Sequence, residues 1–497
     1  MIELFDYQKD GVEFIRNKKK VYIAFDMGMG KTITAIAGHS DIHSKNILII
    51  AEKNEIVNSQ NFKKEIDNNY SGKFKYVSLR DIDIEDIPRN GFICGINPDA
   101  LTKISIEKIK EHFGSIIIDE ATMAKTTSTV RFKKIKKVCD EIEYLTLLSG
   151  TPMMNGASEI YAPLYLMNHW LSGDGSKKSR QTFEKIFAGG FLKQIRHTGI
   201  WWQDWQWWAK GANNVRELRW LIDKNFFFKS KDQTNVFKKK HRIVNEIYMC
   251  DEWKKESDNA WDEYLSKVEN HNKRSSMEER KSIKNIKDLQ NIIENGQVYQ
   301  VNSKWKVKEI IKDIVSKKYG DRRIIIWSIF IETDRIIQEE LTKNGIEFDT
   351  FDNLKEWKKG NKQVLIGRIK SHAKGGNVSE ANVCLFCDMD YVPTMNLQAE
   401  NRIDRPEQKH DMDIVYYLAS KDEIDTHVQK INYDKMRKIE NFVRPFTDEE
   451  VKLMPQKISD LFSKYKKEFE YLAKANGIDD VKVFLDKQVK IKLWTTR

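Results

Sequence analysis

Short apolar runs alternate with longer, polar, helix-like segments in the N-terminal third of the chain, and the same alternation returns in its C-terminal half. A parallel strand buried on both faces is apolar along its whole length, and helices connect successive parallel strands. The chain is therefore predicted to be an α/β protein with two parallel-sheet lobes. The expected strands are Val21–Phe25, Ile47–Ala51, Phe92–Ile96, Ile116–Ile118 and Tyr144–Leu148 in the first lobe, and Arg323–Trp327, Glu347–Phe351, Gln363–Ile366, Val383–Phe386 and Ile414–Leu418 in the second.

Between the two lobes the pattern changes. Residues 156–302 carry few strand-like runs and many charged helical ones, such as Asp251–Lys267 and Ser276–Ile293. Such periodicity predicts helices. The predicted parts are a first lobe at 1–243 with a helical insertion at about 156–243, a helical bridge at 244–302, a second lobe at 303–440 and a basic helical tail at 441–497. One packed face is expected in the tail, formed by Leu461, Phe462, Tyr465, Phe469 and Leu472.

The amino-acid composition limits the kinds of binding partner to be expected. The 497 residues include 85 Lys and Arg against 74 Asp and Glu, a formal charge of +11. That surplus favours a polyanion such as nucleic acid, although a solvated, lysine-rich surface has the same composition. The five cysteines match neither a disulfide framework nor a four-ligand zinc site, and Cys384 and Cys387 are expected to be buried strand residues.

No targeting or membrane signal is found. The segment Met1–Gln8 lacks the basic start and long apolar run of a secretion signal, and no stretch reaches the roughly 18 apolar residues of a membrane span. We expect a soluble, intracellular protein with no membrane partner.

A glycine-containing turn follows the first expected strand. Asp26–Thr32 (DMGMGKT) lies between that strand and a helical pattern, which is the setting of a phosphate-binding loop. Glycines let backbone amides surround phosphate, Lys31 supplies a cation, and the Thr32 hydroxyl is a magnesium ligand. The strict pattern has glycine where this chain has Phe25, so a glycine-rich turn before an ordinary helix is the alternative. The expected nucleotide-binding residues here are Met27, Gly28, Met29, Gly30, Lys31 and Thr32.

Two adjacent acids follow the strand Ile116–Ile118. Ligands bind at the carboxyl edge of parallel sheets, so Asp119 is expected to hold magnesium and Glu120 to orient or deprotonate the attacking water. A helix N-cap is the alternative. The turn Ser149–Asn155 follows the next strand and is expected to sense the nucleotide state.

The second lobe supplies two arginines. In the segment Gln398–Gln408, Arg402 and Arg405 are three residues apart and share a face if the segment is helical. They are expected to act as arginine fingers on the γ-phosphate. The alternative is a helix with solvated ion pairs, Glu400 with Arg402 and Asp404 with Arg405.

Together these segments resemble the motifs of superfamily 2 helicases, and within them the Swi/Snf-like ATPases, over most of residues 1–435. Tyr7–Gln8 resembles the adenine-reading glutamine motif, and the loop at 26–32 resembles motif I in its Swi/Snf form, where Phe25 is no anomaly. The remaining likenesses are Asp119–Thr122 to motif II, Ser149–Asn155 to motif III, Ile324–Ser328 to motif IV, His372–Val378 with Ala381–Asn382 to a shortened motif V, and Gln398, Arg402, Arg405 and Gln408 to motif VI.

The resemblance implies two RecA-like lobes that bind ATP and Mg²⁺ between them. Tyr7, Gln8 and Gln398 would join the loop residues at the nucleotide, and Lys31, Asp119, Glu120, Arg402 and Arg405 would be catalytic. The implied partner is DNA, contacted mainly through its backbone, with recombination or replication proteins as further partners. We expect a monomer, in the bacterial cytoplasm or nucleoid if the gene belongs to a phage.

The insertion gives a weaker indication of substrate. Trp205–Trp207, Gly211, Glu217–Leu218 and Phe226–Lys231 resemble the region before the interlobe helices of fork-remodelling, strand-annealing members. The tryptophans at 201, 202, 205, 207 and 208 could stack on bases or wedge a junction, but a helical face of Trp201, Trp205 and Trp208 packed into the insertion's own core is the favoured interpretation. The lysine runs Lys18–Lys20, Lys133–Lys137 and Lys238–Lys240 either touch phosphates or are solvated surface.

The function predicted from these features is an ATP-dependent translocase on double-stranded or branched DNA, acting in recombination, branch migration or replication-fork remodelling. Three alternatives stay open: a conventional strand-separating DNA or RNA helicase, the motor subunit of a restriction system, and a catalytically idle DNA-binding protein with the same fold.

Overall fold

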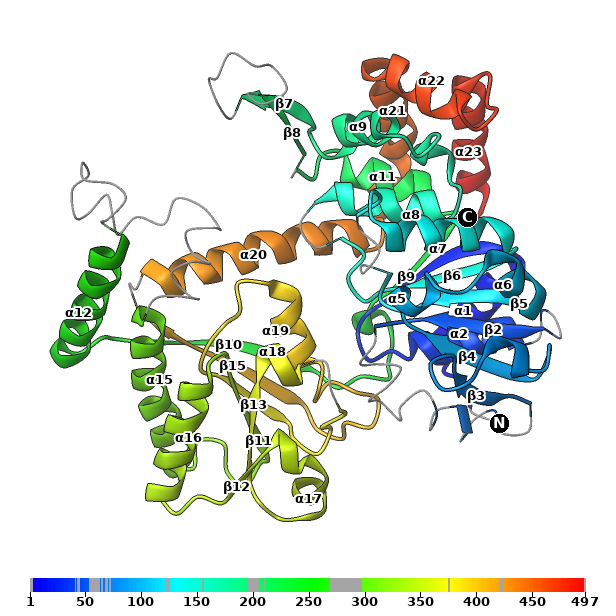
Figure 1. Cartoon of the computed structure of the whole chain (residues 1–497). Helices are drawn as coiled ribbons and strands as arrows, with labels where there is room; N and C mark the ends of the chain where they lie inside the picture. Colours follow the sequence, from blue (N-terminus) through cyan, green and yellow to red (C-terminus); the bar gives the residue numbers. More distant parts are fainter. Residues whose placement is uncertain are drawn as a thin grey trace. The chain divides into compact units, whose positions relative to one another are not determined.

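The computed structural model divides into two compact units, Met1–Gln233 with Arg437–Arg497, and Thr234–Met436 (Figure 1). The first is called unit 1 and the second unit 2. The structure describes residues 3–40, 42, 45–52, 63, 66–67, 70, 73–121, 126–153, 156–194, 205–209, 211–268, 297–373, 376–420 and 423–495.

Unit 1 is built on a seven-stranded parallel sheet in the order β3-β4-β2-β5-β6-β1-β9. Its central strands are buried along their length, which is why the sequence shows unbroken apolar runs there. The strands are β1 Lys20–Phe25, β2 Asn46–Ile50, β3 Lys75–Ser78, β4 Phe92–Ile96, β5 Phe113–Ile118, β6 Tyr144–Leu148 and β9 Phe226–Lys229.

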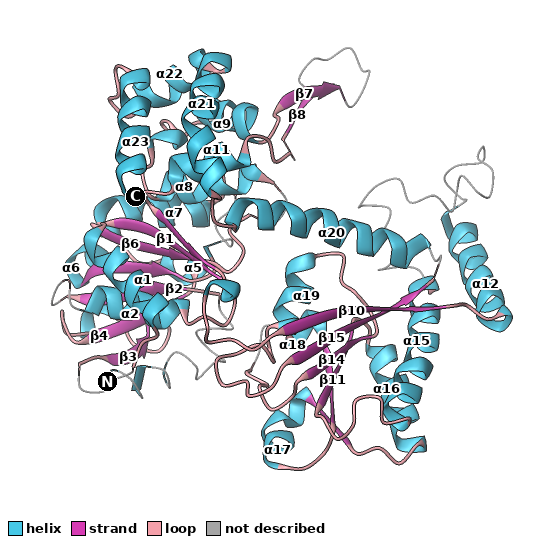
Figure 2. Cartoon of the chain, turned by 180° about the vertical axis from the view of Figure 1, so that it is seen from behind, coloured by secondary structure: helices cyan, strands magenta, loops and turns pink. Residues whose placement is uncertain are grey.

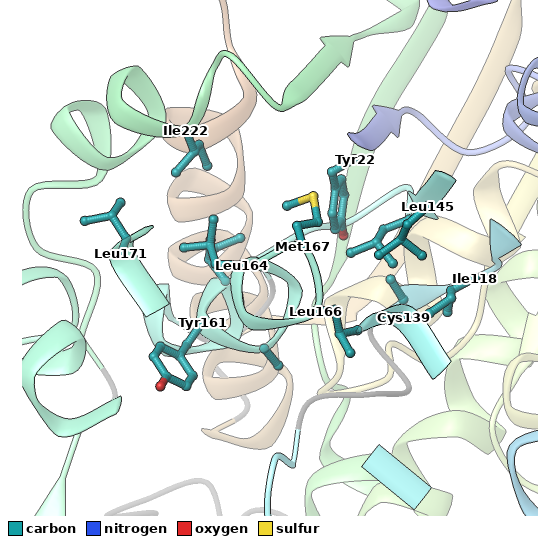
Figure 3. Packing of buried hydrophobic residues seen from close by; sticks show 14 of the residues in the cluster. Tyr22, Ile118, Cys139, Leu145, Tyr161, Leu164, Leu166, Met167, Leu171 and Ile222 are labelled. Atoms are coloured by element: carbon teal, nitrogen blue, oxygen red, sulfur yellow. The ribbon is translucent and has the colours of Figure 1, made fainter. Parts of the chain in front are cut away.

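Helices cover this sheet and extend the unit. They are α1 Asp6–Asn17, α2 Lys31–Ser40, α5 Pro98–Leu101, α6 Ile106–His112, α7 Val130–Glu141, α8 Tyr161–Leu166, α9 Lys177–Phe187, α11 Val215–Ile222, α21 Asp448–Lys464, α22 Lys466–Lys474 and α23 Val481–Thr495. Figure 3 shows side chains from the sheet, α7, α8 and α11 gathering in one core, among them Tyr22, Cys139, Leu164 and Ile222. Burial of this apolar surface joins the insertion to the sheet.

The C-terminal tail belongs to the same core. Leu461, Phe462, Phe469 and Leu472 are buried with the residues of α8 and α9, and Tyr465 packs beside them. The packed face expected in the tail is therefore confirmed. The tail is not a separate part of the molecule, however, because its apolar face is covered by unit 1.

Unit 2 has a six-stranded parallel sheet in the order β10-β15-β14-β11-β13-β12 (Figure 2). Its strands are β10 Lys240–Ile247, β11 Ile324–Ser328, β12 Phe348–Thr350, β13 Val364–Arg368, β14 Val383–Phe386 and β15 Met412–Ala419. Its helices are α12 Asp251–Val268, α15 Val298–Val315, α16 Ile331–Lys343, α17 Leu354–Lys359, α18 Ile369–His372 and α19 Pro393–Glu400, and α20 Glu423–Val443 runs from unit 2 into unit 1.

The prediction of two parallel-sheet α/β lobes is confirmed, with each of the ten expected strands present within a few residues of its predicted ends. The expected boundary at residue 243 is wrong. Strand β10 pairs with β15 along its whole length, so the second unit begins near Thr234. The described residues of the segment 156–302 also include four strands that the sequence did not predict. Strands β7 (Phe191–Gln194), β8 (Trp205–Trp208) and β9 are only four residues long, and β10 carries charged residues.

The cysteines agree with expectation where the structure describes them. Cys384 lies in β14 and Cys387 follows it, and both are buried free thiols. None of the helices in the described part of the chain combines the length and apolarity needed to cross a membrane.

Candidate active site

The loop between β1 and α2 has the backbone of a phosphate-binding turn. Gly28 and Gly30 adopt φ angles of 85° and 73°, in the left-handed region that side-chain-bearing residues rarely enter. Helix α2 begins directly afterwards at Lys31. The first amide groups of the helix therefore lack intrahelical partners where the loop ends, which suits an anion.

Phe25 explains the departure from the strict glycine pattern. It is the last residue of β1 and is fully buried. Its ring meets Tyr7 of α1 edge-on at a centroid distance of 5.7 Å and Phe227 of β9 at 5.7 Å. The side chain thus packs between a helix and a neighbouring strand and leaves the turn unobstructed.

Lys31 is enclosed by the loop and by the turn after β6. Its Nζ donates to the carbonyl oxygens of Phe25 at 3.3 Å and Asp26 at 3.4 Å, and the residue is 9% exposed. A Cβ at Gly150 would lie 3.2 Å from this Nζ and 2.7 Å from Cγ of Met27. Gly150 therefore keeps space beside the ammonium group, a steric role that the sequence did not indicate.

Thr32 and Asp119 meet although they are 87 residues apart. The Thr32 hydroxyl donates to Asp119 Oδ2 at 3.3 Å. A hydroxyl and a carboxylate are hard oxygen donors, and Mg²⁺ in nucleotide sites is held by one or two such groups together with substrate phosphates. The pair fits that metal. Among the described residues, no cluster of three or more His, Cys, Asp or Glu side chains offers an alternative metal site.

Glu120 has an unusual backbone. Its φ is 46°, and its amide donates to Asp119 Oδ1 at 3.0 Å. The Ser149 hydroxyl donates to Glu120 Oε2 at 3.4 Å and accepts from the Thr151 amide at 3.1 Å. The turn after β6 is thereby tied to the acid. A non-glycine residue held in this region is strained, and such strain concentrates at functional sites.

Neither acid caps helix α7. Helix α7 begins at Val130 and is capped by Thr129, whose hydroxyl accepts from Phe132 N. Thr122 of motif II, and residues 154 and 155 of motif III, lie outside the described residues.

Tyr7 and Gln8 contact the loop. Both the Tyr7 hydroxyl and Gln8 Nε2 donate to the Met29 carbonyl at 3.1 Å, and Gln8 Oε1 accepts from the Phe5 amide at 3.0 Å. A Cβ at Gly30 would come within 2.4 Å of Gln8 Nε2. Gln8 thus packs on the phosphate-binding turn, a contact that the sequence did not predict. Its role in reading the adenine base stays a prediction.

In unit 2 the two arginines of motif VI have different environments. Helix α19 ends at Glu400, so the prediction that Arg402 and Arg405 share a helical face is wrong. Arg402 donates from Nε to the Ala373 carbonyl at 2.6 Å and from Nη1 to the Gly376 carbonyl at 3.0 Å. Arg405 Nε is buried and has no hydrogen-bond partner among the described residues.

The acids of motif VI pair with strand β10. Glu400 accepts from Arg242 Nη2 at 2.7 Å and from the Tyr416 hydroxyl at 2.6 Å. Lys240 Nζ lies 3.2 Å from Glu400 Oε2 and 3.1 Å from Asp404 Oδ2. Lys240 was considered for phosphate contact, but its charge is satisfied inside unit 2.

Two glutamines flank these groups. Gln408 Nε2 donates to the carbonyl oxygens of Ala381 at 2.7 Å and Ser379 at 3.2 Å, so it fastens the end of the segment to the motif V loop. Gln398 lies in α19, and its Oε1 is buried with no hydrogen-bond partner in the described part of the chain.

Comparisons with known proteins fit this arrangement. Residues 1–154, which contain the loop and both acids, match the family model of the type III restriction enzyme res subunit. The chain is 22% identical over 455 residues to the Xenopus laevis SWI/SNF-related matrix-associated actin-dependent regulator of chromatin subfamily A-like protein 1, covering 87% of this chain and 43% of that protein. These comparisons show a similarity to Swi/Snf-like superfamily 2 helicases.

The chain is also similar to a second sequence relative and to a solved ATPase core. An uncharacterized ATP-dependent helicase of Mycoplasma pneumoniae is 23% identical over 495 residues, covering 90% of this chain and 44% of that protein. The chain thus spans less than half the length of both relatives. The solved Sulfolobus solfataricus SWI2/SNF2 ATPase core in complex with dsDNA matches with a TM-score of 0.39 and 16% identity, over 95% of this chain and 97% of that one.

The structure brings together the predicted residues of each unit separately. Lys31, Thr32, Asp119 and Glu120 gather in unit 1, whereas the arginines lie in unit 2. A nucleotide shared by the two units stays a prediction. Sequence reasoning missed the strand that carries Lys240 and Arg242, because its charged residues do not alternate with apolar ones.

Proposed function

We propose that this chain is an ATP-dependent translocase that moves on double-stranded or branched DNA. The single observation that carries the proposal is the meeting of Thr32 with Asp119 beside Lys31, at the carboxyl edge of the sheet of unit 1. A cation, a hydroxyl and a carboxylate at the start of a helix form the elements of a nucleoside-triphosphate site. The names of the relatives, ATP-dependent helicase and SWI/SNF-related regulator, support the choice of ATP and DNA.

The residues of unit 1 divide the chemistry among them. Lys31 binds the terminal phosphates. Its hydrogen bonds to the loop carbonyls are long and therefore weak, so the ammonium group can exchange them for stronger bonds to phosphate oxygens. Glu120 orients the attacking water and accepts its proton. Thr32 and Asp119 would hold Mg²⁺, which supplies charge neutralisation at the phosphates when bound.

Arg405 is the arginine best suited to act from unit 2. Burial lowers the pKa of its guanidinium, and its Nε has no internal hydrogen-bond partner in the described residues. A phosphate oxygen would satisfy that donor. Arg402, in contrast, uses its guanidinium on the carbonyls of Ala373 and Gly376 and acts by positioning the motif V loop.

The biological process that we propose is recombination, branch migration or replication-fork remodelling. Support comes from the resemblance of Trp205–Trp207, Gly211, Glu217–Leu218 and Phe226–Lys231 to the region before the interlobe helices of fork-remodelling members. A motor of this kind would act inside the cell and on the DNA backbone.

A second candidate is the motor subunit of a restriction system. The observation that favours it is the family model matched by residues 1–154, whose description names a restriction enzyme subunit. That match covers the nucleotide loop and acids but no part of unit 2. A partner chain would then have to supply a nuclease, so DNA cleavage in a reconstituted mixture would separate this candidate from a remodelling translocase.

The test is the rate of ATP hydrolysis at one fixed salt concentration without nucleic acid and with single-stranded DNA, duplex DNA, a four-way junction and structured RNA. Salt is fixed because phosphate contacts depend on it strongly. The strongest stimulation by duplex or junction supports the proposal. Stimulation by single strands or RNA alone contradicts it and favours a conventional helicase.

Variants with matched controls test which residues form the ATP site. Lys31→Ala and Arg405→Ala are each expected to lower stimulated hydrolysis at least a hundredfold, as losses of single electrostatic groups do at such sites. Their controls are Lys9→Ala and Arg335→Ala, whose side chains are 60% and 58% exposed and form only surface ion pairs. Near-normal ATP hydrolysis by the Lys31→Ala variant would contradict the assignment of the nucleotide site.

A further inference from the structure

A two-stranded ribbon stands out from the helices of unit 1. Strands β7 and β8 pair antiparallel, with Phe191 opposite Trp208 and Leu192 opposite Trp207, and they form a sheet of their own. Figures 1 and 2 show the ribbon projecting away from α9 and α11. The tryptophans at 205 and 208 are therefore on a strand, and the expectation that they share a helical face is wrong; Trp201 and Trp202 lie outside the described residues.

One face of the ribbon is attached to the protein. The Trp207 indole donates to Glu184 Oε2 of α9 at 2.7 Å, and Glu184 is buried and paired with Arg180 at 2.9 Å. A Cβ at Gly190 would lie 2.3 Å from the Trp207 ring, so the ring packs directly on the chain leading into β7. These contacts fix which face of the ribbon points outward.

The opposite face carries a different set of side chains. Directly opposed residues of a ribbon share a face, so Phe191 and Trp208 lie together, and Lys193 joins them two residues along. Phe191 is 52% exposed, every residue of β7 is exposed, and Lys193 Nζ lies 4.7 Å from the centroid of the Trp208 ring. This set of Phe191, Lys193 and Trp208 is called the outer face. None of the three belongs to the buried core of unit 1 as the structure describes it.

The surrounding sequence is strongly basic. Residues 177–214 include seven Lys and Arg, at 177, 178, 180, 185, 193, 196 and 210, and two acids, at 184 and 204, a net charge of +5. Glu184 is one of the two acids and is already paired internally. A face formed by the exposed Phe191 and the half-buried Trp208 in a basic segment complements a polyanion whose own surface includes flat apolar rings.

We propose that the outer face of the ribbon binds unpaired bases of DNA. The proposal rests on the DNA-translocase function above and names the part of a branched substrate that this chain recognises. Phosphates attract the cations of any basic surface, but aromatic rings stack only on bases that are not already stacked within a duplex. Phe191 and Trp208 offer two rings at one site, and Lys193 places an ammonium where the adjoining phosphate would lie. A fork or junction presents such bases at its branch point.

The experiment measures binding, without hydrolysis, to a fork with single-stranded arms, to a blunt duplex of the same length, and to single-stranded RNA. The fork carries 2-aminopurine in one arm, because stacking on an aromatic ring quenches its fluorescence. Phe191→Ala and Trp208→Ala are each expected to weaken fork binding about tenfold or more and to abolish the quenching, with a smaller loss on duplex. Leu192→Ala, 44% exposed on the opposite face, is the matched control.

Folding and function are tested separately. Phe191→Leu keeps an apolar side chain and removes the ring, so it should bind the fork as weakly as Phe191→Ala while its thermal unfolding matches the wild type. Equal fork affinity of wild type and Phe191→Ala, equal losses on fork and duplex, or tighter binding of RNA would each overturn the proposal. If the wild type binds the fork through this face but no DNA stimulates ATP hydrolysis, the translocase function fails and the ribbon site stands.

Discussion

The guanidinium of Arg402 donates a hydrogen bond from Nε to the carbonyl oxygen of Ala373 at 2.6 Å. A second bond from Nη1 reaches the Gly376 carbonyl at 3.0 Å, and the Val378 amide donates to the Arg402 carbonyl at 2.9 Å. The motif V loop is therefore held by a motif VI arginine. This gives Arg402 and Arg405 separable roles, although the sequence presents them as a matched pair.

The two arginines should differ in their effect on stability. Arg402→Ala removes two charged hydrogen bonds and is expected to lower the free energy of unfolding of unit 2 by about 1–3 kcal/mol. Arg405→Ala removes a buried guanidinium whose Nε is unsatisfied, so it should leave that free energy within about 0.5 kcal/mol or raise it. Urea unfolding checks both variants. A larger loss in Arg405→Ala than in Arg402→Ala would contradict the division of roles.

The phosphate-binding turn should not tolerate a side chain at Gly30. A Cβ there meets Gln8 Nε2 at 2.4 Å, and the φ of 73° costs an L-residue about 1–2 kcal/mol. Gly30→Ala is expected to weaken binding of a fluorescent ATP analogue at least tenfold. Gln8→Ala combined with Gly30→Ala removes the clash but not the backbone strain, so its affinity should recover only in part when compared with that of Gln8→Ala alone. Full recovery would show that the clash alone matters.

Glu400 should make unit 2 sensitive to acid. Burial raises the pKa of its carboxyl, but the charges of Lys240 and Arg242 and the hydrogen bonds from Arg242 and Tyr416 outweigh burial and lower the pKa from 4.5 to about 2. Because the folded-state pKa is depressed, the stabilisation is present above the unfolded pKa and is lost as pH falls towards 2. The difference corresponds to roughly 3 kcal/mol at neutral pH.

Glu400→Gln tests this dependence. The variant should be less stable than the wild type at pH 7, and the difference in free energy of unfolding should shrink between about pH 5 and pH 2. Denaturant unfolding across that range measures it. A difference that does not change with pH would mean that Glu400 contributes nothing through its charge.

The attachment of the C-terminal tail to the rest of unit 1 should depend on Arg216. This residue of α11 contacts both oxygens of Glu450 at 3.0–3.1 Å and donates to the carbonyl oxygens of Asn441 and Pro445 at 2.9 and 3.1 Å. Breaking a largely buried ion pair typically costs about 3 kcal/mol. Arg216→Ala is expected to lower the melting temperature and to expose the tail to early proteolysis. Arg131→Ala, a surface arginine 63% exposed, is the control and should change neither.

The sequence by itself determined the two sheets and the nucleotide loop. Strands such as Ile47–Ala51 and Ile324–Ser328 are apolar throughout because they are buried on both faces, and that local composition is visible without any partner. The spacing of Gly28, Gly30 and Lys31 is likewise a local property of the backbone, and the structure gives both glycines left-handed φ angles.

Only the tertiary structure decided where charged and aromatic groups are used. β10 carries Lys240 and Arg242, and its role became visible when β15 paired with it and Glu400 met both cations. The spacing of the tryptophans predicts that Trp208 lies on a helix. Its pairing with Phe191 makes it a strand residue instead. Short, charged strands are stabilised by their neighbours in space and not by their own sequence, so no local pattern could identify them.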